Sequence, residues 1–133
     1  MAYTINNIRD FKSLDVYNKI RELVKDVYKI TEQFPPSEQY GATSQIRRAV
    51  TSIAATVAEG NGQLYPSKEI TFLNTAIGSL SETRSWILFG LDMDYIAKED
   101  YDRLEAKCLE IIKMLYGCVR RIKQSQENDD GAA

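Results

Sequence analysis

The feature that most constrains the fold is an apolar stripe in the last third of the chain. Its residues recur alternately three and four positions apart: Tyr101, Leu104, Cys108, Ile111, Leu115, Cys118 and Ile122. This spacing places them on one face of an α-helix and is typical of helices packed in left-handed bundles. We predict a helix over residues 98–124. The polar residues that follow, 125–133, are predicted to form a flexible tail because they have little apolar surface to bury.

Three earlier segments also show helical periodicity. They cover residues 13–33, 43–59 and 67–91. Pro35 and Pro36 are expected to end the first helix, because a residue that precedes proline avoids the helical conformation. Thr43 or Ser44 is expected to cap the second helix, and Ser67 the third. The stripe predicted to face the core from the third helix is Leu73, Ile77, Leu80, Arg84, Ile87 and Leu91.

Four helices with short connections and no strand-like alternation predict an all-α fold, an antiparallel up-and-down four-helix bundle. Residues 1–124 are expected to form this single domain. The first helix carries two adjacent apolar stripes, one through Tyr17 and Val24, the other through Val16 and Leu23. Because one stripe is enough to fill a bundle core, a second is typical of a subunit interface. We therefore expect assembly as a homo-oligomeric ring with closed rotational symmetry.

Composition excludes several classes of function. The 133-residue chain contains no histidine and so lacks the commonest general base and metal ligand. Glycine-rich phosphate loops and nucleophile elbows are also missing from the sequence. Glu69 and Glu82 do not suggest a metal pair, because such bundle sites need a Glu-x-x-His partner. We expect no enzymatic activity, no metal, no cofactor and no small-molecule substrate.

The sequence also bears on location. Cys108 and Cys118 lie about 15 Å apart along the predicted helix, which is too far for a disulfide. Both are expected to be buried free thiols in a reducing compartment. The N-terminus shows no signal-peptide pattern, and no window of ~20 apolar residues could span a membrane. We predict a cytoplasmic protein without membrane contact.

Two groups of cations are candidate nucleic-acid ligands. Arg47 and Arg48 are consecutive in the second helix, whereas Arg120, Arg121 and Lys123 lie near the predicted end of the fourth. Their charged groups suit the phosphates of RNA. Two alternatives stay open. The first two arginines could form ion pairs between helices or subunits, and the other three cations could stabilise the negative end of their helix.

A polar stripe on the second helix is the candidate subunit interface: Gln45, Arg48, Ser52 and Glu59. Arg48 and Glu59 are about 16 Å apart along one helix and cannot pair within it. Neighbouring subunits of a ring would instead bring Arg48 of one chain near Glu59 of the next. Several aromatic residues could stack on bases, but their spacing favours core or interface positions. They are Tyr17, Tyr28, Tyr40, Tyr65 and Trp86.

Several short motifs resemble the four-helix bundle family of 23S rRNA intervening-sequence proteins. They are Phe11-Lys12-Ser13-Leu14-Asp15-Val16, Phe34-Pro35, Gln45-Ile46-Arg47-Arg48-Ala49, Ala58-Glu59-Gly60, Gly78-Ser79-Leu80-Ser81-Glu82 and Asp94-Tyr95-Ile96. The resemblance covers about residues 11–96. It implies a bacterial, non-enzymatic bundle that assembles as a homopentamer and associates with rRNA or a ribonucleoprotein. A protein-binding scaffold without nucleic-acid contact is the alternative function.

Overall fold

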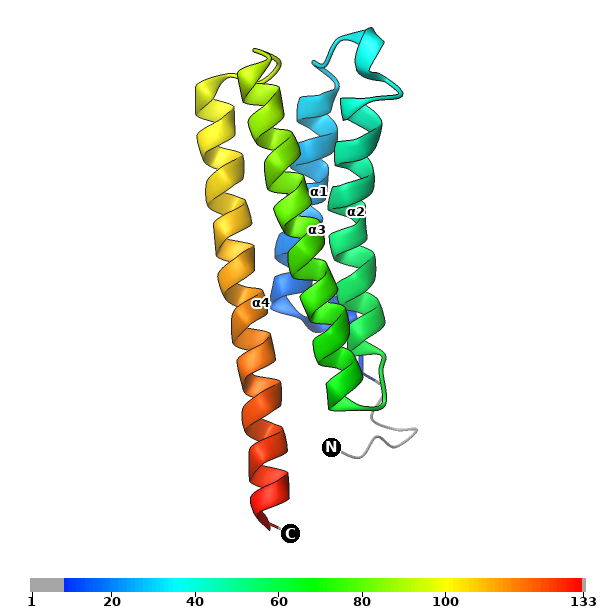
Figure 1. The fold of residues 1–133 in the computed structure, drawn as a ribbon, viewed down its shortest axis with the longest axis vertical. Helices are drawn as coiled ribbons and strands as arrows, with labels where there is room; N and C mark the ends of the chain where they lie inside the picture. The colour runs from blue at the N-terminus through cyan, green and yellow to red at the C-terminus, as the bar shows by residue number, and fades with distance from the viewer. Residues whose placement is uncertain (1–8, 133) are drawn as a thin grey trace.

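The computed structural model describes residues 9–132 as four long helices that run alternately in opposite directions (Figure 1). The elements in chain order are η1 (Phe11–Ser13), α1 (Asp15–Thr31), η2 (Pro36–Glu38), α2 (Ala42–Asn61), α3 (Pro66–Asp92) and α4 (Lys98–Ala132). Every regular element in this part of the chain is helical, which confirms the predicted all-α, four-helix fold.

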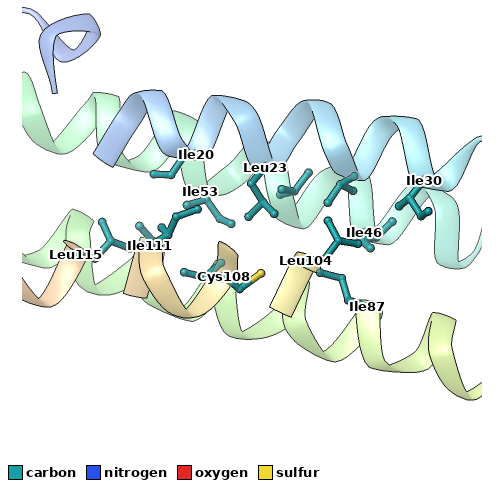
Figure 2. Packing of buried hydrophobic residues seen from close by; sticks show 14 of the residues in the cluster. Ile20, Leu23, Ile30, Ile46, Ile53, Ile87, Leu104, Cys108, Ile111 and Leu115 are labelled. Carbon is teal, nitrogen blue, oxygen red and sulfur yellow. The ribbon is translucent and has the colours of Figure 1, made fainter. Parts of the chain in front are cut away.

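The core lies along the axis of the bundle, and all four helices contribute to it (Figure 2). Its largest fully buried side chains are Ile20, Leu23, Val27, Ile46, Val50, Ile53, Leu80, Ile87, Ile96, Leu104, Ile111 and Leu115. Burial of each such side chain stabilises the fold by about 1.5–3 kcal/mol. On α1 the stripe through Val16 and Leu23 is buried, while Tyr17 and Val24 are half-buried and pack against the same core. The second stripe of α1 is therefore not a free apolar surface, contrary to our expectation.

The stripe that α3 turns toward the core differs from the predicted one. Leu73, Leu80 and Ile87 are buried as expected, but the other buried positions of the stripe are Glu69, Ala76, Thr83 and Gly90. Ile77, Arg84 and Leu91 are only half-buried. Small residues at alternate positions let neighbouring elements approach α3 closely, and α3 makes its most extensive contact with α2.

Three helix starts differ from the predictions, and α1 begins at Asp15 instead of Ser13. α2 begins at Ala42, ahead of Thr43 and Ser44, and the backbone N–H of Ala42 donates to Glu38 Oε1 at 3.3 Å. α3 begins at Pro66, whose missing N–H costs nothing at the first helical position, and no side chain caps this end. Ser67 is therefore not the cap, because proline already sets the helical backbone one residue earlier.

The C-terminal end of α4 is also placed differently. The helix continues to Ala132 instead of ending at Gln124, and it extends past the other helices at that end of the bundle (Figure 1). Its side chains from residue 125 to 131 are exposed except for Gln126, which is half-buried. The polar sequence correctly indicated that this segment buries little, but it did not indicate that the segment is helical.

Both cysteines are free thiols, and they differ in burial. Cys108 lies in the core, whereas Cys118 is only half-buried, so the expectation of two buried thiols holds for the first alone. Burial raises the pKa of the Cys108 thiol to about 12. Burial also raises the pKa of Cys118, although the nearby Arg121 opposes this shift.

Candidate nucleic-acid interface

The five candidate cations fall into two separate places on the bundle. Arg47 and Arg48 lie in the first half of α2, near the end of the bundle that contains the α1–α2 connection. Arg120, Arg121 and Lys123 lie on α4 toward the opposite end, beside the start of α3 (Figure 1). The structure therefore does not bring the two groups into one site.

Arg47 joins α2 to α1. Its Nε donates to Thr31 Oγ1 at 2.9 Å, and its Nη2 donates to the backbone oxygen of Tyr28 at 3.2 Å. The guanidinium group also lies 4.6 Å from the centre of the Tyr28 ring, where the negative face of the ring attracts it. With these contacts made inside the chain, Arg47 has a structural role in holding the two helices together.

Arg48 makes an ion pair between helices of the same chain. Its Nη2 lies 2.6 Å from Glu82 Oε2 on α3 and 3.0 Å from Gln45 Oε1. The same Glu82 oxygen accepts from Trp86 Nε1 at 3.4 Å. Of the alternatives that the sequence left open for Arg48, the structure shows the pairing between helices. A second pairing, with Glu59 of another subunit, stays a prediction.

The polar stripe of α2 faces α3 for most of its length. Gln45 and Arg48 form the contact just described, and the Ser52 and Ser79 hydroxyl groups lie 3.1 Å apart. Glu59 is exposed near the end of α2. Three of the four candidate interface residues thus already have partners on α2 or α3 of their own chain. Their use between subunits stays a prediction.

The cations of α4 do not cap the helix. Lys123 is followed by about two and a half further turns, because α4 ends at Ala132. The field of a helix end decays within its last turn, so the proposed stabilisation of the helix terminus is wrong. Arg120, Arg121 and Lys123 are instead exposed on the side of a continuous helix.

Arg120 and Lys123 line a groove of about 610 Å³ between α3 and α4. The other side chains that line it are Ile70, Thr71, Asn74, Ile77, Tyr116 and Val119. Tyr116 is 52% exposed, so about half of its side chain is accessible. The groove thus combines apolar side chains, an aromatic ring, polar side chains and two cations.

Arg121 lies outside this groove. It borders a separate groove of about 520 Å³ between the start of α1 and α4, together with Asp15, Glu110 and Lys113. Its Nη2 lies 3.3 Å from Cys118 Sγ. Since two carboxylates share this second groove, it has a mixed charge and suits an RNA phosphate less well than the α3–α4 groove.

The two glutamates considered for metal binding have other partners. Glu69, buried at the start of α3, receives two hydrogen bonds from Arg9, with distances of 3.0 and 2.6 Å. Glu82 is the partner of Arg48. Among residues 9–132, no group of three histidine, cysteine, aspartate or glutamate side chains is placed to hold a metal ion. None of the helices described here is long and apolar enough to cross a membrane.

The aromatic residues also divide into two kinds. Tyr17 and Trp86 are half-buried, in agreement with a packing role, and Tyr28 lies beneath Arg47. Tyr40 is 89% exposed and Tyr65 is 66% exposed, so a core position is wrong for both. Sequence reasoning missed Tyr116, although it lies one helical turn before Arg120 and outside the α4 core stripe.

Comparison with known proteins is consistent with this fold. No match was found among curated proteins. A solved structure described as a protein of unknown function from the S23 ribosomal protein family of Bacteroides thetaiotaomicron is 26% identical, with a TM-score of 0.70. The match covers 78% of this chain and 97% of that one. A family model for the 23S rRNA-intervening sequence protein matches residues 12–117. Because this match spans most of the sequence, the chain belongs to the 23S rRNA-intervening sequence protein family.

Proposed function

We propose that the protein is a non-enzymatic accessory protein that binds RNA in the bacterial cytoplasm and works as a homo-oligomer, expected to be a pentameric ring. The RNA is rRNA or part of a ribonucleoprotein. The observation that carries the proposal is the α3–α4 groove, where Arg120 and Lys123 lie beside the exposed ring of Tyr116. The name of the family, which refers to 23S rRNA, supports the same class of ligand.

The groove offers the contacts that single-stranded RNA requires. Arg120 and Lys123 can bind backbone phosphates, which supply most of the sequence-independent affinity. Tyr116 can stack on a base, since stacking on an aromatic ring contributes about 1–3 kcal/mol per base. Asn74 and Thr71 provide amide and hydroxyl groups at the same groove. Unpaired or looped RNA fits this arrangement better than a duplex, because its bases are free to stack.

The α3–α4 groove carries two cations, whereas the chain as a whole is mildly acidic. The chain has a net charge of −2, so long-range attraction to RNA is weak. Binding then depends on short-range contacts with Arg120 and Lys123, and it should be strongest at low ionic strength, where screening is weakest. Arg47 and Arg48 contribute little in this proposal, because both are engaged with neighbouring helices.

Assembly into a ring would place several copies of the groove on one particle. Apolar side chains that remain exposed on α3, directly after it and on α4 support such assembly, namely Leu88, Met93 and Leu109. Repeated grooves would raise the overall affinity for a long RNA without any new kind of contact, because each further site binds at high effective concentration.

Binding of a labelled, single-stranded fragment of 23S rRNA at low salt tests the proposal. Arg120→Ala/Lys123→Ala should weaken binding by about tenfold or more, since two phosphate contacts are lost. Lys25→Ala/Lys29→Ala is the matched control, because it also removes two exposed cations, here from α1. No binding by the wild type, or equal losses in the two variants, would refute the proposed site.

One observation favours the alternative function as a protein-binding scaffold. Leu64 and Tyr65, in the connection between α2 and α3, are each 66% exposed. Adjacent exposed apolar side chains of this kind are typical of protein contact sites. A scaffold would retain partner binding after loss of the cations of the α3–α4 groove, whereas an RNA-binding protein would lose its ligand.

A further inference from the structure

We propose that two copies of this chain associate through the C-terminal parts of their α4 helices, packed antiparallel. In this contact Arg120 and Lys123 of each copy lie against Asp130 and Glu127 of the other. The proposal concerns protein–protein association and does not rest on RNA binding.

The four charged residues form one stripe on α4. Positions 120, 123, 127 and 130 are spaced three, four and three residues apart, so they share one face of the helix. All four side chains are exposed. The stripe continues the α4 wall of the α3–α4 groove, which contains Arg120 and Lys123. Figure 1 shows that this end of α4 extends past the other helices, so a second helix can reach it.

The stripe is complementary to itself in one arrangement. Its first two charges are positive and its last two are negative. Positions 120 and 130 are equally far from residue 125, and so are positions 123 and 127. In an antiparallel pair centred on residue 125, each cation of one copy therefore shares a layer with an anion of the other. A two-fold axis makes both halves of the contact equivalent.

The charges near the C-terminal end of α4 are placed more favourably beside a second copy than in a single chain. Glu127 and Asp130 lie near the C-terminal end of α4, where the helix already carries partial negative charge and acidic residues are unfavourable. Beyond Ile122 this end is polar on all sides, and such a short helical segment gains little stability on its own. A second copy supplies cations beside these carboxylates and aligns its helix dipole in the opposite direction. Its Gly131 would lie opposite Val119, where a residue without a side chain allows close approach.

The contact is small and mainly electrostatic, which determines how it should behave. Exposed ion pairs are individually weak and are screened by salt, so association should be detectable at low ionic strength and high protein concentration. Arg120 and Lys123 would be covered in the pair. The same two side chains could therefore not contact RNA at the same time.

Two double variants with the same net charge separate this arrangement from general charge effects. Arg120→Glu/Asp130→Lys exchanges the signs of two residues that share a layer, so attraction is kept in every layer. Arg120→Glu/Glu127→Lys makes the same kinds of change but places like charges together in every layer. Both variants alter exposed side chains, and circular dichroism would verify that each retains the helical content of the wild type.

Sedimentation velocity over a concentration series at low salt, without RNA, is the test. We expect the wild type and Arg120→Glu/Asp130→Lys to associate reversibly, and Arg120→Glu/Glu127→Lys to associate at least about tenfold more weakly. High salt should abolish the difference between the variants. A wild type whose sedimentation coefficient does not change with concentration would overturn the proposal, and so would equal association of the two variants. If the variants differ in RNA binding and not in self-association, the stripe contacts RNA alone and the proposal is wrong.

Discussion

Replacement of Gly90 by alanine should destabilise the bundle, although alanine favours helices more than glycine does. Gly90 is buried in α3, and a Cβ atom at this position would lie 2.6 Å from Ile96 Cδ1 and 3.3 Å from Phe34 Cζ. Ile96 and Phe34 are only 2% and 6% exposed, so neither can move aside easily. The backbone also resists a shift, because the N–H of Ile96 donates to the Gly90 oxygen at 3.1 Å.

The expected magnitude follows from two opposing effects. Overpacking in a buried site costs about 1–3 kcal/mol, and alanine gains about 1 kcal/mol over glycine in a helix interior. The net change for Gly90→Ala is therefore a loss of up to about 2 kcal/mol. Gly78, in the same helix, is the matched control, since a Cβ there would meet no heavy atom of the described residues within 4 Å beyond the adjoining backbone of its own helix. Gly78→Ala should stabilise by about 0.5–1 kcal/mol.

Urea unfolding followed by circular dichroism measures both changes. The difference in the free energy of unfolding between the two variants should be about 1–3 kcal/mol, which is the steric cost alone. Equal stabilisation by Gly90→Ala and Gly78→Ala would refute the reasoning, because it would mean that Ile96 and Phe34 do not pack against Gly90.

Three further predictions concern side chains within the bundle. Arg47→Met should lower the free energy of unfolding by about 1–2 kcal/mol, since it removes the contacts with Thr31 and Tyr28; unchanged stability in urea would contradict this role. A double-mutant cycle of Arg48→Ala and Glu82→Ala should give a coupling energy of about 0.2–1 kcal/mol, because both side chains are partly exposed; zero coupling would show that the pair does not stabilise the bundle. Burial raises the pKa of Cys108 to about 12, so the native protein holds this proton to higher pH than the unfolded chain. This difference in pKa stabilises the native protein in full below the ordinary thiol pKa of about 8.5, and the stabilisation is lost as pH rises toward 12. Urea midpoints should therefore fall more steeply over this pH range for the wild type than for Cys108→Ala.

The heptad pattern was sufficient to predict the number of helices and most of the core. It succeeded best on α4, where Leu104, Cys108, Ile111 and Leu115 are all buried. It was less accurate on α3, because periodicity alone does not show that Ala76 and Gly90 face inward while the larger Ile77 and Leu91 lie at the edge. That choice depends on how closely the neighbouring elements approach, which is a property of the packed bundle.

The candidate site was harder to predict for a related reason. The sequence indicated which cations to consider, but it could not show that Arg48 meets Glu82, which is 34 residues away in the chain. It also placed the end of α4 too early, and this error suggested a capping role for Lys123 that the continuous helix excludes. The groove itself combines residues of two helices, so its aromatic member, Tyr116, was missed.

The dependence of RNA affinity on salt tests the central claim most directly. For single-stranded RNA, the logarithm of the binding constant should fall linearly with the logarithm of the salt concentration, with a slope of about −0.7 for each phosphate contact. Arg120→Ala/Lys123→Ala should therefore reduce the steepness of this slope by about 1.4, while Lys25→Ala/Lys29→Ala leaves it unchanged. An affinity of the wild type that does not depend on salt, or identical slopes for all three proteins, would contradict RNA binding at the α3–α4 groove.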